Sequence, residues 1–340
     1  ETVARTRVCQ LSGRGLVTNG WAKAQTFQQD TGYTSTFEGA FGGKLKSFWV
    51  YPSGVVNLTG TESTFTYGDN SLPGFGSIGA VKIGYDANDD SSLGHTSTIT
   101  LGPNGGNGYS KLTFLGTSGE TTVKTLKFAP WTNAGGGGKC ILDAGLGGLV
   151  WNGNWTPATC AMVWAVIQGD GAATNVMGGV FNETTGSTYL EKLGAGTWFL
   201  KPSRSGHKGV TAVKEGKLLF ETLRERGTAC SLGLSTLTHS AYWKSTIDDS
   251  KAVPYAFLLG GGSQGEAVLE CVGQEGATVP NSANERPLVL AGKGRLVTTC
   301  AEDFALSGVS SIAAEPVTLT LDGTNGKSRL NAVSNGTSAV

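Results

Sequence analysis

The sequence predicts an all-β chain, and three observations lead to this prediction. Short segments rich in aliphatic, aromatic and β-branched residues recur along the 340 residues, whereas helical periodicity is almost absent. Glycine, with 53 residues, is far above average usage and falls between these segments. A cassette of strand-like segments and glycines also occurs twice, which is typical of repeat architectures. We therefore expect short strands that are turned by glycine.

The clearest strands lie between Val180 and Gly233. Four segments there show β-type alternation: Tyr189–Leu193, Thr197–Lys201, Val210–Lys214 and Lys217–Glu221. They are separated by residues that accept positive φ at no steric cost: Gly194, Gly196, Gly206, Gly209 and Gly216. The spacing leaves no room for a helix between them.

Similar segments continue on both sides of this stretch: Ser97–Leu101, Lys111–Leu115, Val123–Phe128, Lys139–Leu142, Gly148–Trp151, Ala161–Ile167, Tyr255–Leu259, Ala267–Val272, Pro287–Leu290, Arg295–Thr299 and Pro316–Leu321. The run Glu221–Arg226 holds helix-forming residues. It is too short for a stable helix and predicts a single turn or a charged loop.

The internal repeat organises the whole chain. Ser92-Leu93-Gly94 matches Ser231-Leu232-Gly233, and Ala80-Val81-Lys82 matches Ala212-Val213-Lys214. These matches define cassettes at approximately 1–36 (partial), 37–179 and 180–340 within one continuous domain, 1–340. The start at Glu1 and the end in mid-pattern predict a piece of a longer precursor.

Ten spaced positions resemble the autotransporter-associated β-strand repeat, also called the passenger-associated transport repeat: Leu190, Lys192, Gly194, Gly196, Thr197, Leu200, Gly209, Val213, Gly216 and Leu218. The segment Pro202–His207 departs from the family pattern. The resemblance implies a right-handed parallel β-helix, an elongated rod with irregular corner loops. It also implies an extracellular or bacterial cell-surface passenger and says almost nothing of activity.

Hairpin signals are too irregular to favour antiparallel folds. Asn-Gly pairs occur at Asn19, Asn152 and Asn325, but they do not separate strands of equal length. Together with the resemblance, this favours coils of about 20–25 residues whose strands stack in parallel. Aliphatic residues and phenylalanine should point inward, and Thr, Ser and Lys outward.

The six cysteines form no Cys-x-x-Cys pair, which argues against zinc and redox motifs. In an oxidised extracellular chain Cys140 with Cys160, and Cys271 with Cys300, would lie one coil apart and could form disulfides. Cys9 and Cys230 would be many coils apart, so any bond would be intermolecular. Buried thiols are the alternative.

Composition excludes several classes of partner. Lys+Arg and Asp+Glu balance at 26 each, so no basic stripe is available and we expect no nucleic-acid partner. No apolar run reaches the roughly 18 residues of a membrane span.

No catalytic, cofactor or metal site emerges. Gly261–Gly265 fits Gly-x-Ser-x-Gly, but no histidine follows His239, as a hydrolase would require. Asp86–Asp90 begins like a calcium loop but lacks the later glycine and glutamate. His95, His207 and His239 have no metal-type neighbours and are expected in loops or on the surface.

Tryptophans and sequons leave two questions open. Trp131, Trp151, Trp155 and Trp164 either pack in the core or form an exposed row that stacks on sugars. Sequons occur at Asn57, Asn154, Asn182 and Asn335.

The predicted function is therefore a non-enzymatic extracellular structural protein, a segment of a bacterial surface fibre or stalk. Its expected partners are copies of itself, added head to tail into filaments. An adhesin or glycan-binding passenger module is the first alternative, and a polysaccharide-degrading β-helix enzyme is the second.

Overall fold

A computed structural model of the chain consists of strands joined by turns and loops, with no helix among the residues that it describes. The description covers the chain except residues 1–4, 9, 19–24, 51–52, 74–75, 103–107, 130–137, 158–162, 184–185, 202–203, 225, 237–256, 263–264, 273–285, 300–303, 307, 312, 314–315, 324–327, 331–332 and 336–340. The all-β class is confirmed. Within the described ranges, no helix is long and apolar enough to cross a membrane.

The chain divides into two compact units. Unit 1 comprises residues 1–165 and 170–175, and unit 2 comprises residues 166–169 and 176–340. Strands of unit 1 are β1 (Arg5–Val8), β2 (Leu16–Thr18), β3 (Gln25–Gln29), β4 (Thr34–Phe37), β5 (Ala40–Gly42), β6 (Lys44–Val50), β7 (Val55–Leu58), β8 (Thr66–Pro73), β9 (Ser77–Ala80), β10 (Thr98–Gly102), β11 (Tyr109–Phe114), β12 (Glu120–Thr122), β13 (Thr125–Phe128), β14 (Gly138–Asp143), β15 (Leu149–Trp151) and β16 (Trp155–Pro157).

The strands β17 (Val163–Gln168) and β18 (Thr174–Met177) contain residues of both units. Strands of unit 2 are β19 (Thr188–Lys192), β20 (Thr197–Leu200), β21 (Thr211–Val213), β22 (Gly216–Phe220), β23 (Phe257–Leu259), β24 (Ala267–Cys271), β25 (Leu288–Leu290), β26 (Gly294–Thr298), β27 (Phe304–Leu306), β28 (Val309–Ser311), β29 (Leu319–Gly323), β30 (Ser328–Leu330) and β31 (Val333–Asn335). Every predicted strand segment overlaps one of these strands.

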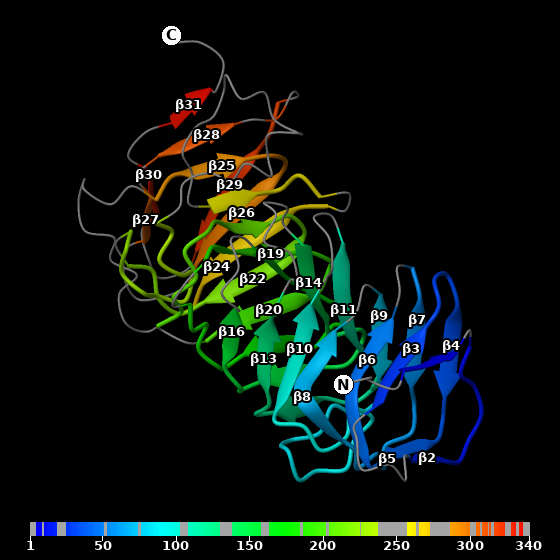
Figure 1. The fold of residues 1–340 in the computed structure, drawn as a ribbon. Helices are drawn as coiled ribbons and strands as arrows, with labels where there is room; N and C mark the ends of the chain where they lie inside the picture. The colour runs from blue at the N-terminus through cyan, green and yellow to red at the C-terminus, as the bar shows by residue number, and fades with distance from the viewer. Residues whose placement is uncertain are drawn as a thin grey trace. The chain divides into compact units, whose positions relative to one another are not determined.

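In unit 1, consecutive strands belong to different rows of parallel strands. One sheet has the order β1-β3-β6-β8-β10-β13-β16, and a second row has the order β4-β7-β9-β11-β14. The short pairs β2–β5 and β12–β15 form further rows. Figure 1 shows β8, β10, β13 and β16 with their arrows in the same direction. Parallel neighbours require such crossovers, because a hairpin would place them antiparallel.

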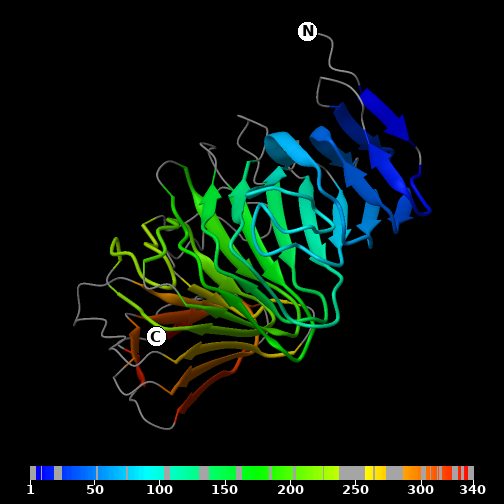
Figure 2. The same ribbon diagram turned by 90° about the horizontal axis from the view of Figure 1, so that it is seen from below.

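Unit 2 repeats this alternation. Its rows have the orders β19-β21-β23-β25-β28-β31 and β20-β22-β24-β26-β29, with β27–β30 as a third pair. Seen from below, the strands within each unit are stacked side by side (Figure 2). Both units therefore consist of long parallel rows, as a β-helix or a related solenoid requires.

The core is built from ladders of apolar side chains. In unit 2, Trp198 is opposite Leu218, and the same position continues as Leu269 and Leu296 on the next two strands. All four are at most 2% exposed. Each such burial contributes about 1.5–3 kcal/mol, so the ladder holds successive strands in register.

Glycines at the corners have two different roles. Gly194 and Gly216 have φ of 73° and 63°, as predicted. Gly206 and Gly209 have no positive φ. At Gly209 an added Cβ would lie 2.6 Å from the Tyr189 ring, so close packing demands this glycine.

The spacing between stacked strands is less regular than predicted. Thr197 on β20 is paired with Lys217 on β22, whereas Leu218 on β22 is paired with Leu269 on β24. The sequence separation between paired residues more than doubles from the β20–β22 pair to the β22–β24 pair. The expectation of a nearly constant coil length is therefore wrong for this part of unit 2. The strands keep their register although the length of chain between them changes.

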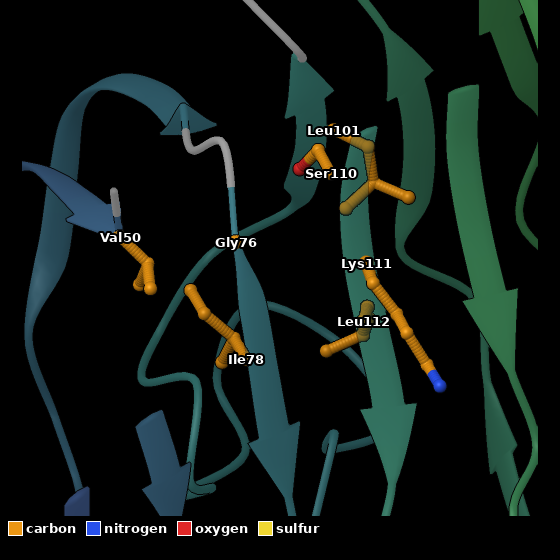
Figure 3. A pocket seen from close by; sticks show the side chains of 7 residues that line it. All are labelled: Val50, Gly76, Ile78, Leu101, Ser110, Lys111 and Leu112. Carbon is orange, nitrogen blue, oxygen red and sulfur yellow. The ribbon is translucent and has the colours of Figure 1, made fainter. Parts of the chain in front are cut away.

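Unit 1 contains a small apolar cavity between two of its rows of strands. A cavity of about 10 Å³ is lined by Val50, Gly76, Ile78, Leu101, Ser110, Lys111 and Leu112. Figure 3 shows the apolar side chains of Ile78 and Leu112 near one another, with the Lys111 ammonium directed away. A single water needs at least about 10–15 Å³, so this cavity is a packing defect rather than a ligand site.

Candidate functional site

Two corners share one local design, and both lie where the sequence repeats. In unit 1 the turn 91–94 is buried, and the Ser91 hydroxyl donates a hydrogen bond to the Gly94 carbonyl at 3.1 Å. In unit 2 the turn 230–233 is buried, and the Cys230 thiol donates to the Gly233 carbonyl at 3.1 Å. The two segments that match in sequence therefore also form the same hydrogen bond within the turn.

The glycine that ends each turn packs on a ring. Gly94 has φ of 69°, and an added Cβ would lie 2.9 Å from the Phe65 ring. Gly233 has φ of 77°, and an added Cβ would lie 2.6 Å from the His207 ring. Phe65 and His207 also accept equivalent backbone hydrogen bonds at 2.8 Å from the residues after the turns. His207 thus occupies the position of Phe65.

A buried cation completes each corner. Lys124 Nζ donates to the carbonyls of Ile83 at 2.8 Å and Gly94 at 3.1 Å. Arg286 donates through Nη2 to the carbonyl of Gly233 at 2.9 Å. Both side chains are at most 1% exposed. Corner carbonyls outside the strand ladders need donors, and these cations supply them.

A third cation follows the same principle inside unit 2. Lys192 is fully buried, and its Nζ donates to the carbonyls of Leu193, Gly194 and Glu215 at 2.8, 2.6 and 3.1 Å. The expectation that lysines face outward is therefore wrong for Lys124 and Lys192. Their ammonium groups hold corner backbone together.

Burial gives Lys124 a measurable pH signature. Desolvation is the largest cause that lowers its pKa to about 8, whereas an unfolded lysine has a pKa near 10.4. Between these values the unfolded chain binds more protons, so folding stability rises with pH. We expect unit 1 to gain about 3 kcal/mol between pH 7.5 and 10.5 relative to Lys124→Met, in urea unfolding. The exposed Lys127→Met serves as control, and parallel curves for wild type and Lys124→Met would contradict the prediction.

An open groove of about 360 Å³ adjoins the unit 1 corner. One wall is the loop from Lys82 to Asp89, and the other is the segment 116–121 of the next coil. Tyr85 is 52% exposed at the groove. Gly116 is required there, because an added Cβ would lie 2.3 Å from the Phe114 ring.

The loop that carries Tyr85 is fixed by carboxylates. Glu120 accepts hydrogen bonds from the backbone N–H groups of Ile83 at 3.0 Å and Gly84 at 2.6 Å. Asp89 accepts from Tyr85 N–H at 2.9 Å and from Lys82 Nζ at 3.2 Å. The Tyr85 N–H is the main cause that holds the pKa of Asp89 below its usual value. Hydrogen bonds to two carboxylates therefore fix the loop that forms this wall of the groove.

The segment Asp86–Asp90, which begins like a calcium loop, uses its carboxylates for local contacts. Asp86 accepts from Asn88 N–H at 2.8 Å, and Asp90 lies 2.6 Å from His95 Nε2. In the described part of the chain no three His, Cys, Asp or Glu side chains gather as a metal site would require.

The predicted repeat-motif residues lie on strands and corners of unit 2. Leu190, Leu200, Val213 and Leu218 are buried on β19, β20, β21 and β22. They belong to the buried core of unit 2. These residues do not gather into a binding site.

Three of the six cysteines can be placed. Cys140, Cys230 and Cys271 are buried, and no disulfide occurs among the described residues. Cys9, Cys160 and Cys300 lie outside the described residues, so both predicted pairings stay predictions. Cys230 is fully buried, so an intermolecular bond would require its corner to open.

The remaining candidates are divided between core and surface. His207 lies outside the strands, between β20 and β21, in keeping with the expectation of a loop or surface residue, but it is fully buried. His95 is partly exposed, and His239 lies outside the described residues. Trp151, Trp155 and Trp164 are buried in the core, and Trp131 is not among the described residues. Asn154 and Asn182 are exposed and Asn57 is half-buried on β7, whereas the side chain of Asn335 on β31 is not described.

Comparison with known proteins gives no relatives: no family model, curated protein or solved structure matches the chain. The site is therefore assigned from its own geometry. Sequence reasoning named the acidic loop 86–90 but missed Tyr85, Glu120 and Arg286. For Glu120 and Arg286 the reason is that their backbone partners lie more than 30 residues away in the chain.

Proposed function

We propose that this chain is a non-enzymatic structural segment of a bacterial cell-surface or extracellular fibre. We further propose that it is a right-handed parallel β-helix of the autotransporter passenger type, and that copies of the chain add head to tail. Support for the helix comes from the parallel rows and from the way in which β4, β5 and β6 fall in three different rows. Ladders of buried apolar residues through successive strands give it a continuous core.

The observation that carries the proposal is a pair of apolar end strands. β2 ends its row and exposes Leu16 by 67% and Val17 by 39%. β29 ends its row in unit 2 and exposes Leu321 by 46%. Terminal strands offer unpaired backbone groups and uncovered side chains to another strand.

The two end strands, β2 and β29, belong to corresponding rows, as the order of strands along the chain indicates. In unit 1, β5, the partner of β2, follows a strand of the second row, β4. In unit 2, β29 follows β28, a strand of the corresponding row. A second copy can therefore continue the β29 row with its own β2, in parallel, and bury both apolar ends. Such a contact is heterologous and generates filaments rather than closed dimers.

Charged substitutions at the two ends test this assembly. We expect the wild-type chain to show concentration-dependent growth in sedimentation velocity, and Leu16→Asp or Leu321→Asp alone to stop it. An equimolar mixture of the two variants should form dimers, because each retains the end that the other lacks. Leu146→Asp, at a position that is 75% exposed but distant from either end strand in sequence, should assemble like wild type.

Two results would overturn the proposal. One is a wild-type chain that stays monomeric at every concentration, and the other is a variant mixture that does not pair. Circular dichroism of each variant verifies that the substitution leaves the fold intact.

The two alternatives have different support. The tryptophans that the structure describes with their side chains are buried, so they cannot form an exposed row that binds glycans. Support for a glycan-binding module comes instead from the groove beside Tyr85. A glycan-cleaving enzyme needs a carboxylic acid with a raised pKa. In the groove the pKa of Asp89 is lowered, and both of its oxygens are engaged by Tyr85 and Lys82.

A further inference from the structure

We propose that the groove between the loop 82–89 and the segment 116–121 of unit 1 binds an uncharged oligosaccharide, with Tyr85 as the stacking surface. This inference concerns recognition, which the proposed structural role does not require. It also does not depend on that role, because all of the groove residues belong to unit 1.

The dimensions of the groove are those of a small-ligand site. Its volume of about 360 Å³ falls within the range of about 300–1,000 Å³ that is usual for such sites. Gly116 and Gly119 line it without side chains, so a ligand can approach the backbone there. It is partly open to solvent rather than an enclosed cavity.

The chemistry of the lining matches a sugar ring. A pyranose has an apolar face of C–H groups and an edge of hydroxyls that both donate and accept hydrogen bonds. Tyr85 offers a half-exposed aromatic face, and Thr117, Ser118 and Thr121 offer exposed hydroxyls beside it. Glu120 adds carboxylate oxygens that retain free lone pairs after accepting two backbone hydrogen bonds.

Preorganisation adds to the argument. The backbone of Ile83, Gly84 and Tyr85 is held by Glu120 and Asp89 from outside, and Lys124 Nζ holds the Ile83 carbonyl from inside. A ligand that stacks on Tyr85 therefore loses little free energy to ordering of the loop.

Charge selects among glycans. The ionisable side chains that line the groove are Lys82, Asp89 and Glu120, which together carry one net negative charge when ionised. Lys82 is already paired with Asp89. An anionic sugar such as a uronic acid would meet repulsion without a free cation, so neutral sugars should bind better.

The test uses the full chain and a glycan array with neutral and acidic oligosaccharides, followed by calorimetry on the strongest neutral hit and on tetragalacturonic acid. We expect binding to neutral glycans, with no stronger binding to the acidic one. Tyr85→Ala should weaken binding about 5- to 10-fold, as loss of an aromatic stack predicts, and Tyr85→Phe should retain it. Tyr33→Ala, at an exposed tyrosine elsewhere in unit 1, should bind like wild type.

Several outcomes would overturn the assignment. They are an array without neutral hits, unchanged binding by Tyr85→Ala, a preference for tetragalacturonic acid, or release of shorter sugars that reveals hydrolysis. Because Leu16→Asp blocks the proposed assembly and leaves the groove intact, its binding should equal that of wild type. Failure of the glycan test and failure of the assembly test are therefore distinguishable.

Discussion

Replacing His207 by phenylalanine is expected to remove an acid-dependent weakness of unit 2. His207 is fully buried, its Nε2 lies 2.9 Å from Thr211 Oγ1, and its Nδ1 has no hydrogen-bond partner among the described residues. Burial, with a smaller contribution from the Arg286 charge, lowers its pKa to about 3. Phe65 occupies the equivalent corner of unit 1 without any such group, so the substitution copies a solution that the chain already uses.

The direction of the effect follows from proton linkage. An unfolded histidine has a pKa near 6.5 and binds a proton that the folded residue rejects. The stability that depends on the neutral His207 is therefore fully present above pH 6.5, and it is lost as the pH falls towards 3. At pH 4 the wild-type chain should have lost about 3 kcal/mol relative to His207→Phe, measured as the difference between their urea unfolding curves at pH 7 and pH 4.

A histidine elsewhere provides the control for this experiment. His95 is partly exposed in unit 1 and pairs with Asp90, so His95→Asn should leave the pH dependence of unit 2 unchanged. If His207→Phe and wild type lose stability in parallel between pH 7 and pH 4, the buried imidazole is not the acid-sensitive group.

Substitution of Lys192 by methionine is expected to destabilise unit 2 by about 3 kcal/mol or more. Methionine keeps most of the apolar stem but supplies no donor to the three carbonyls that Lys192 now holds. Buried carbonyls that lose a charged donor retain their desolvation cost. The measurement is the midpoint of urea unfolding, which should fall while the slope is kept.

The matched control is Lys201→Met in the same unit, where the side chain is exposed. We expect it to change stability by less than about 0.5 kcal/mol, as is usual for surface positions. A Lys192→Met chain as stable as Lys201→Met would show that the buried ammonium group contributes nothing to the corner.

Local sequence signals were sufficient for part of the strands. Alternation such as that in Thr197–Lys201 predicts β20, and Ser92-Leu93-Gly94 and Ser231-Leu232-Gly233, matched in the sequence, lie in two turns of the same design. The parallel direction followed from the irregular hairpin signals and the family resemblance. These features depend on residues close together in the chain, so periodicity and glycine placement reveal them.

Long-range partners could not be predicted in the same way. Lys124 meets the corner carbonyl of Gly94 from 30 residues away, and Arg286 meets that of Gly233 from 53 residues away. Lysine and arginine are rarely buried in proteins, so hydropathy places both side chains outside. Only the three-dimensional structure shows that their charges satisfy backbone groups, and the same holds for Glu120 at the groove.

The unequal spacing of paired strands has a consequence for how such a chain can change. The connection from β22 to its ladder partner β24 is much longer than that from β20 to β22, yet both pairs keep their register. The ladders therefore tolerate extra length in the connecting segments. Doubling a loop costs only about 0.6 kcal/mol of closure entropy. Foreign peptides grafted into the connecting segments, away from the buried turns 91–94 and 230–233, should thus be displayed at little thermodynamic cost. This tolerance makes the chain a carrier for engineered epitopes.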